Sequence, residues 1–276
     1  MKKIMLFILS IFTMISCDPL VDNKDMGGIL SEDQIDISVK STTEGSNEIV
    51  MENYTPGIVP YWDFIINTST NQKETAVMPF IGELTISCTA ICDGGTVTTT
   101  RKVNVTKLDK PIPEQWNMLA SEELSGKVWV WDTDQPFVYG TAGYGNNYAP
   151  AWSAFNPGAQ VMAGKIVSTD EEMVFDRNGG PNFTRRKTSG TVVEKGLFKF
   201  DMTKQKIRDD GAVWSIGQMQ FTNATVITGS SCWSNDPVYT FDIISLSADR
   251  MVLAYAAPGT EFQVWNEATF WCFKAK

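Results

Sequence analysis

The chain has 276 residues, with 23 basic and 32 acidic side chains, a net charge of −9 and no histidine. The missing histidine excludes the Ser-His-Asp and Cys-His nucleophile systems in their usual form, and also zinc sites that use histidine ligands. The acidic balance argues against nucleic acid, whose binding depends on basic side chains that contact phosphates. A carboxylate-only glycosidase and a calcium site both stay open.

Residues 1–17 predict export of the protein. Two lysines precede an apolar run over residues 4–15, and Ser16 and Cys17 follow it. A basic start, a short apolar segment and a small residue before the cleavage point form a secretory signal. The segment MISC resembles the bacterial lipobox, although Met14 stands where that family prefers leucine. The resemblance implies that Cys17 is lipidated and anchors the protein in the outer membrane.

Residues 18–26 are polar and turn-rich, as expected for a tether. The aspartates after Cys17 resemble the acidic tether of surface-exported lipoproteins in Gram-negative polysaccharide degraders, which implies a place on the cell surface. Removal of the signal also takes away two lysines, so the net charge falls from −9 to −11. An anionic polysaccharide or lipid surface is then disfavoured, and a neutral ligand is the best-supported partner.

Residues 27–110 are predicted to form the first domain. Apolar side chains alternate with polar ones from Leu84 to Cys92, which indicates a strand with one buried face. Asp93-Gly94-Gly95 follows and suits a tight turn, because these residues tolerate positive φ. The alternation resumes over residues 97–105, so the segment is predicted to be a β-hairpin.

Several short motifs of this domain resemble the PKD type of immunoglobulin-like domain. They are Trp62-Asp63-Phe64, the strand over residues 82–86, the Gly94-Gly95 turn and Val103-Asn104-Val105, whereas INTST replaces the family's usual Gly-Asp-Gly. The resemblance implies a β-sandwich that serves as a spacer or adhesive module. Trp62 is then expected in the core, because such sandwiches bury a tryptophan between their sheets.

Residues 107–116 read KLDKPIPEQW and predict a stiff, exposed connector, with the domain boundary at 110/111. Residues 111–276 form the predicted second domain. A short helix is expected over residues 115–124, followed by a strand in SGKVWVWD and a meander of strands in the last third. Such a meander closes into a sandwich or a barrel. We expect a jelly-roll-like or related antiparallel β-sandwich, so the fold class of the whole chain is all-β.

Long segments of the second domain resemble a lipoprotein module of the surface glycan systems in gut-type bacteria. The segments are KVWVWDTDQPFVYGTAGYG, GLFKFDMTKQKIRDDGAVWSIGQMQF, YTFDIISLSADRMVLAYAAPG and EATFWCFK. Members commonly follow a PKD-like domain. The resemblance implies glycan binding, with outer-membrane glycan-uptake proteins as further partners.

The segment YGTAGYGNNYAPAW, residues 139–152, has the composition of a sugar-binding loop. Tyr and Trp present flat rings with a polar tip, Asn both donates and accepts hydrogen bonds, and Gly lets the backbone approach a ligand. Two further loops carry tryptophans. The predicted glycan-binding residues are Trp131, Asp132, Tyr139, Tyr144, Asn146, Asn147, Tyr148, Trp152, Trp233 and Trp265.

Other interpretations of these residues stay open. A tryptophan on a strand is usually core, and the loop rings could pack across one end of the sandwich instead of binding sugar. Asp132 and Asp134 could bind calcium, although no cofactor is expected, and a Cys232–Cys272 disulfide is an alternative to free thiols. A glycosidase needs two carboxylates at a set separation, and the Glu-x-Asp-x-x-Glu strand of jelly-roll glucanases is absent from the sequence. We therefore predict a non-catalytic glycan binder, with a structural or adhesive protein and a carboxylate-only glycosidase as alternatives.

Overall fold

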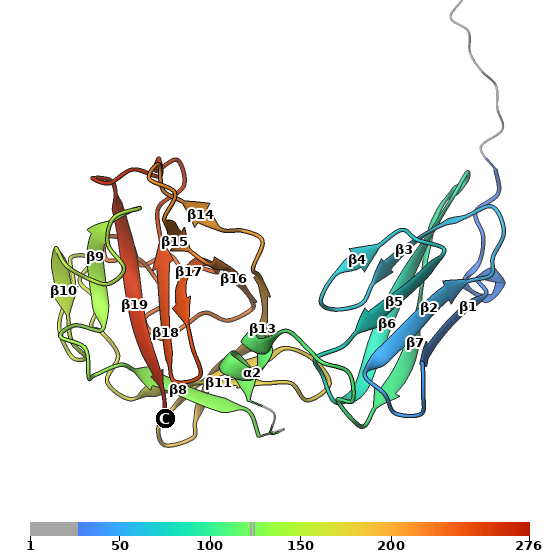
Figure 1. Cartoon of the computed structure of the whole chain (residues 1–276), viewed down its shortest axis with the longest axis horizontal. Helices are drawn as coiled ribbons and strands as arrows, with labels where there is room; N and C mark the ends of the chain where they lie inside the picture. Colours follow the sequence, from blue (N-terminus) through green and yellow to red (C-terminus); the bar gives the residue numbers. More distant parts are fainter. Residues whose placement is uncertain (1–26, 122, 124) are drawn as a thin grey trace, which may run out of the picture.

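The computed structural model describes residues 27–276, apart from 122 and 124. The predicted signal, Cys17 and the tether over residues 18–26 lie outside the described residues. Within the described part of the chain, no helix is long and apolar enough to cross a membrane. Strands dominate the described residues, so the all-β prediction is confirmed (Figure 1).

The first half of the described chain is a pair of antiparallel sheets, which we call the sandwich (Figure 1). One sheet has the order β1-β2-β5 and the other β4-β3-β6-β7. The buried side chains of the two sheets share one core, which contains Met51 and, as predicted, Trp62. The elements are η2 (Glu32–Gln34), β1 (Ile37–Ser41), β2 (Glu48–Asn53), β3 (Val59–Asp63), β4 (Thr68–Ser69), β5 (Lys73–Val77), β6 (Gly82–Cys92) and β7 (Gly95–Val105).

Strands β6 and β7 confirm the predicted hairpin. Alternate side chains from Leu84 to Ala90 are fully buried, and the residues between them are exposed or half-buried. Cys92 pairs with Gly95, so a two-residue turn joins the strands. The period-two pattern specified this register, because a slip of one residue would turn the apolar face to solvent.

The second half is an antiparallel barrel (Figure 1). Its order is β8-β11-β12-β13-β16-β17-β18-β19, and β19 returns to pair with β8. The strands are β8 (Lys127–Trp131), β11 (Glu171–Asp176), β12 (Asn182–Lys187), β13 (Val192–Asp201), β16 (Gly217–Thr222), β17 (Thr240–Leu246), β18 (Arg250–Tyr255) and β19 (Glu267–Ala275). The eight strands follow chain order, so the connectivity is a simple meander.

Closure of this sheet corrects the predicted jelly-roll-like sandwich. Residues 273–275 of β19 pair with β8, and residues 267–271 pair with β9 (Tyr139–Gly143). A short strand, β10 (Ser153–Phe155), continues the sheet beyond β9. The last strand therefore joins the first one, and a single closed sheet replaces two facing sheets.

Aromatic rings fill the barrel. Trp131 stacks on Phe273 with centroids 4.9 Å apart, and Phe241 meets Trp271 edge-on at 5.1 Å. A barrel of this size is wide enough for side chains to fill it. The strand tryptophans of β8 and β19 are buried and belong to the core. This agrees with the prediction for Trp271, whereas Trp131 was predicted to contact glycan.

The helix α2 (Glu114–Ala120) connects the sandwich to the barrel. The ring of Trp116 lies 5.1 Å from Phe80, just after β5, and 4.6 Å from Phe200 on β13. The Trp129 indole N–H donates to the carbonyl of Leu119 at 2.9 Å. The predicted helix is present but ends before residue 121, and this part of the predicted exposed connector is packed against both halves.

A second cluster lies on the outer face of the barrel, and we call it the outer core. Ala268 and Phe270 alternate along β19 with Trp271 and Phe273, whose side chains join the main core. A small hairpin of β14 (Lys206–Ile207) and β15 (Val213–Ser215) covers this face. The buried members of the outer core are Ala142, Tyr144, Trp214, Ile244, Ala254, Ala268 and Phe270.

Candidate functional site

The predicted aromatic loop, residues 139–152, begins with strand β9, so the loop prediction is wrong for its first five residues, and the segment contributes to both cores. Tyr139 packs inside the barrel, and its hydroxyl donates to the carbonyl of Ser230 at 2.7 Å. Tyr144 belongs to the outer core, with ring centroids 5.1 Å from Trp214 and 5.1 Å from Phe262. Both tyrosines are buried. They support the fold and do not offer a ring face to a ligand, which corrects their predicted role.

Two features of the loop composition follow from this packing. Gly145 has a φ of +92°, and a Cβ there would lie 2.9 Å from the Phe262 ring, so glycine is needed where the loop meets that ring. The side-chain oxygen of Asn147 accepts a hydrogen bond from the Gly143 N–H at 3.1 Å. The backbone carbonyl of Asn147 accepts one from the Trp214 indole N–H at 2.7 Å. Asn147 is thus part of the loop's own structure.

Asp132 and Asp134 form ion pairs across the barrel wall. Asp132 is buried and lies 2.8 Å from Arg250, and Asp134 lies 2.9 Å from Lys274. The hydrogen bond and charge of Lys274 lower the pKa of Asp134. The described residues contain no group of three or more potential metal ligands. Asp132, together with the buried Trp131, therefore belongs to the wall and core of the barrel and not to a ligand surface.

An ion pair between the half-buried Lys206 and the buried Asp242 lies against Tyr144 of the outer core. The Lys206 ammonium lies 2.5 Å from the Asp242 carboxylate and 4.8 Å from the centroid of the Tyr144 ring. It also donates a hydrogen bond to the Tyr144 hydroxyl. Burial lowers the pKa of Lys206. The hydrogen bonds to Asp242 and Tyr144 raise it by more, so the pKa lies above its ordinary value.

The remaining predicted aromatic residues are exposed, but to different extents. Tyr148 and Trp152 are 44% and 45% exposed, Trp233 is 62% exposed and Trp265 is 83% exposed. Asn146 is exposed as well. Of the predicted set, these five side chains are available to a ligand.

Trp233 is exposed but held by the neighbouring strand, because its indole N–H donates to the Glu267 carboxylate. Its loop is fixed by Lys165, whose ammonium donates to the Ser230 hydroxyl at 2.5 Å and to the Ser234 carbonyl at 2.8 Å. The adjacent Cys232 is a free thiol, as is Cys272, so the disulfide considered above does not form.

Trp265 lines a groove of about 520 Å³ on the barrel, which we call the Trp265 groove. One side comes from the loop before β19, and the other comes from the turn between β14 and β15. The lining residues are Gly145, Arg208, Asp209, Asp210, Phe262, Gln263, Val264 and Trp265. The outer core fixes both sides, because Phe262 packs on Tyr144 and on Trp214, 5.4 Å away.

The polar groups of the groove are partly ordered before any ligand binds. Arg208 pairs with Asp210 at 3.0 Å, and the Gln263 amide donates to Glu261 at 2.7 Å. Asp209 adds a second carboxylate to the lining, so the charged groups of the groove carry a net negative charge. Carboxylates accept hydrogen bonds and guanidinium groups donate them, which suits a ligand that does both.

Sequence reasoning selected Trp265 and missed the opposite side of this groove. Arg208, Asp209 and Asp210 lie in the segment KIRDDGAVW, whose Asp-Gly pair is a turn signal between two short strands. That signal could have located the hairpin. Its position beside the loop over residues 262–265 depends on the outer core, which no local pattern reveals.

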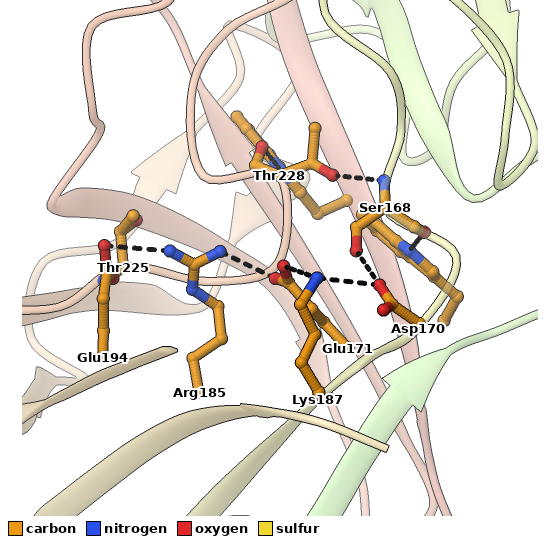
Figure 2. A network of polar contacts seen from close by, with 10 residues as sticks. Ser168, Asp170, Glu171, Arg185, Lys187, Glu194, Thr225 and Thr228 are labelled. Atoms are coloured by element: carbon orange, nitrogen blue, oxygen red, sulfur yellow. Dashed lines mark hydrogen bonds and ion pairs between the residues drawn. The ribbon is translucent and has the colours of Figure 1, made fainter. Parts of the chain in front are cut away.

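A larger charged network links neighbouring strands of the barrel. Figure 2 shows Arg185 between Glu171 and Glu194, at 2.7 and 2.9 Å, and Lys187 on Glu171 at 3.1 Å. Arg185 lies on the same face of β12 as the core residue Phe183. The opposite charges are paired within the wall, so the network ties β11, β12 and β13 together and is not an empty binding site.

No family model matches this chain, and no curated protein matches it. Among solved structures, the chain is similar to the PKD1 domain of Epp from Vibrio anguillarum, with 28% sequence identity. The match covers 26% of this chain and 90% of that domain, with a TM-score of 0.23. The matched structure is a PKD domain, and the match extends to a minor part of the chain.

Proposed function

We propose that the protein is a non-catalytic, lipid-anchored surface protein that holds a neutral glycan in the Trp265 groove. The observation that carries the proposal is the 83% exposure of the Trp265 side chain at the edge of a groove lined by polar groups. A tryptophan in contact with so much water gains free energy when an apolar surface covers it. The C–H face of a sugar ring is such a surface, and its hydroxyls can reach the polar groups beside it.

The groove also favours a neutral ligand over an anionic one. Its lining has one cation, Arg208, which is paired with Asp210, and Asp209 adds a further negative charge. The negative charge of the whole chain acts in the same direction. Uronic acid or sulfated polymers would be repelled, whereas neutral oligosaccharides and polysaccharides would not.

Affinity electrophoresis on neutral polysaccharides tests the proposal. The protein to use is residues 18–276 without the lipid, with Trp265→Ala as the variant and Trp233→Ala as the matched control. Trp233 is also well exposed but lies outside the groove. We expect a neutral polymer to retard the parent and Trp233→Ala, and Trp265→Ala to bind at least tenfold more weakly, which is about 1.4 kcal/mol.

Two results would contradict the proposal. Retardation that Trp265→Ala leaves undiminished would place the glycan elsewhere on the protein. No retardation by any neutral polymer, with folded protein, would favour a structural or adhesive role without a small ligand. Product release from a bound polymer would instead support the glycosidase alternative.

A further inference from the structure

A second groove lies between the sandwich and the barrel and has a volume of about 700 Å³. Strands β13 and β16 of the barrel supply one wall, and the turn from β3 to β4 supplies the other. We call it the interdomain groove. None of its lining residues lines the Trp265 groove.

The two walls are held in a fixed relation by the backbone. The Ile81 N–H donates to the carbonyl of Arg177 at 3.2 Å, and the Gly179 N–H donates to the carbonyl of Ile81 at 2.6 Å. Phe200, which lines the groove, packs against Trp116 between the sandwich and the barrel. The groove is therefore preformed, which lowers the entropic cost of binding.

The barrel wall of the groove presents donors and acceptors on two paired strands, β13 and β16. We call these four side chains the barrel grid: Lys199, Asp201, Gln218 and Gln220. Gln218 and Gln220 are two residues apart on β16, roughly 7 Å at strand rise. Across the ladder, Lys199 is opposite Gln220, and Asp201 is opposite Gln218. The Gln220 amide donates to the Gln218 oxygen at 3.1 Å, which leaves an acceptor on Gln220 and donors on Gln218 directed away from their own bond.

The sandwich wall is a strained turn. Ile65 has a φ of +75°, a conformation that a β-branched side chain rarely adopts. The turn is maintained by the Asp63 carboxylate, which accepts from the Ile65 N–H at 3.1 Å, and by the Asn67 carbonyl, which accepts from the Phe64 N–H at 3.1 Å. Strain of this kind clusters where a surface must keep one particular shape for a ligand.

The charges of the interdomain groove balance. Lys199 and Lys204 face Asp63 and Asp201, and amide and hydroxyl groups supply most of the remaining polar lining. A lining without net charge and with adjacent donors and acceptors fits a ligand whose groups both donate and accept. Neighbouring hydroxyls of a sugar have this property.

We infer that the interdomain groove is a second saccharide site, which binds a neutral oligosaccharide through hydrogen bonds from the barrel grid and the β3–β4 turn. The ligand class rests on the proposed function, whereas the position of the site does not. The Trp265 groove binds by ring stacking and this groove by hydrogen bonding. One chain therefore carries two separate glycan sites on its outer surface.

Titration calorimetry of residues 18–276 with cellohexaose, maltohexaose and mannohexaose tests the inference. The variant is Gln218→Ala/Gln220→Ala, and Thr222→Ala is the matched control, because Thr222 is exposed on β16 and does not line the groove. Thr68→Trp, in the opposite wall, is a second variant that fills the groove without touching the grid. Unchanged melting temperatures show that the variants are folded.

We expect two oligosaccharides per chain for the parent and Thr222→Ala, and one for the double glutamine variant and for Thr68→Trp. The site that the double glutamine variant and Thr68→Trp retain is the Trp265 groove, and Trp265→Ala should remove it. A single site that requires Trp265 and ignores the glutamines would overturn this inference and leave the proposed function standing. A single site that requires the glutamines but not Trp265 would overturn the proposed function and leave the position of this second site standing. No binding of any of the three oligosaccharides would overturn both.

Discussion

The aromatic rings of two neighbouring segments differ sharply in exposure. In residues 139–152, Tyr139 and Tyr144 are buried, whereas Tyr148 and Trp152 are exposed. In the loop over residues 262–265, Phe262 packs on Tyr144 while Trp265 remains in solvent. The composition of a loop therefore does not decide the exposure of its rings. The presence of a second layer does, and here the β14–β15 hairpin lies over the first loop.

The largest effect should come from the tryptophan at the centre of the outer core. Trp214→Ala removes a fully buried ring that contacts Tyr144, Phe262 and Phe270, and should lower the free energy of unfolding by about 3–5 kcal/mol. Urea unfolding measures this change. Trp233→Ala is the control, with an expected change within about 0.5 kcal/mol because its ring is exposed. Equal effects for the two variants would mean that the outer core does not support the loop.

A somewhat smaller loss is expected when the ion pair between the half-buried Lys206 and the buried Asp242 is broken. Asp242→Asn leaves the Lys206 ammonium without its carboxylate, and should cost about 3 kcal/mol in the free energy of unfolding. Replacement of both partners by Lys206→Met/Asp242→Leu should cost much less, because no unpaired charge remains in the cluster. A double variant as unstable as Asp242→Asn would show that the pair contributes by its geometry and not by charge neutralisation.

The same pair predicts a dependence on alkaline pH. The pKa of Lys206 is raised above its ordinary value of 10.5, so protonated Lys206 stabilises the folded state below that value. This stabilisation is lost as the pH rises through the folded-state pKa. The stability advantage of the parent over Lys206→Met/Asp242→Leu should therefore shrink above about pH 10.5. Urea midpoints at neutral and alkaline pH measure this, and a constant difference would contradict it.

A smaller effect isolates the hydroxyl of Tyr144. Tyr144→Phe keeps the ring contacts in the outer core and removes the oxygen that accepts a hydrogen bond from Lys206. Because that donor is charged, the loss should be about 1–2 kcal/mol in the free energy of unfolding. Tyr148→Phe is the matched control on an exposed tyrosine of the same loop, and should change little. If Tyr144→Phe left the free energy of unfolding unchanged, the contribution of this residue to stability would come from its ring alone.

The sequence predicted local features well and long-range closure poorly. The hairpin of β6 and β7 follows from an alternation that one strand carries by itself. The core positions of Trp62, Trp214 and Trp271 also follow from their strand-like surroundings. The barrel does not, because its closure rests on a few pairings between β19 and β8, strands far apart in the chain. A meander has the same pattern whether or not its ends meet.

The candidate site shows the same limit. Trp265 could be selected by residue type, but Tyr139 and Tyr144 were selected by the same argument and are buried. What separates them is the β14–β15 hairpin and the depth of the barrel, and neither leaves a signal in the loop. Arg208 and its neighbours could be predicted as a turn, but not as the other side of a groove.

The smallest expected change in stability concerns Trp265, and it tests the exposed half of the comparison directly. Trp265→Phe should alter the free energy of unfolding by no more than about 0.5 kcal/mol, because the ring lies largely in solvent. It should also remove a large share of the fluorescence that acrylamide quenches, since Trp265 is the most exposed of the described tryptophans. Trp214→Phe, the control, should instead remove emission that acrylamide hardly reaches. If Trp265→Phe left the quenchable emission unchanged, its ring would be packed in solution, and the groove would lack the platform on which glycan binding depends.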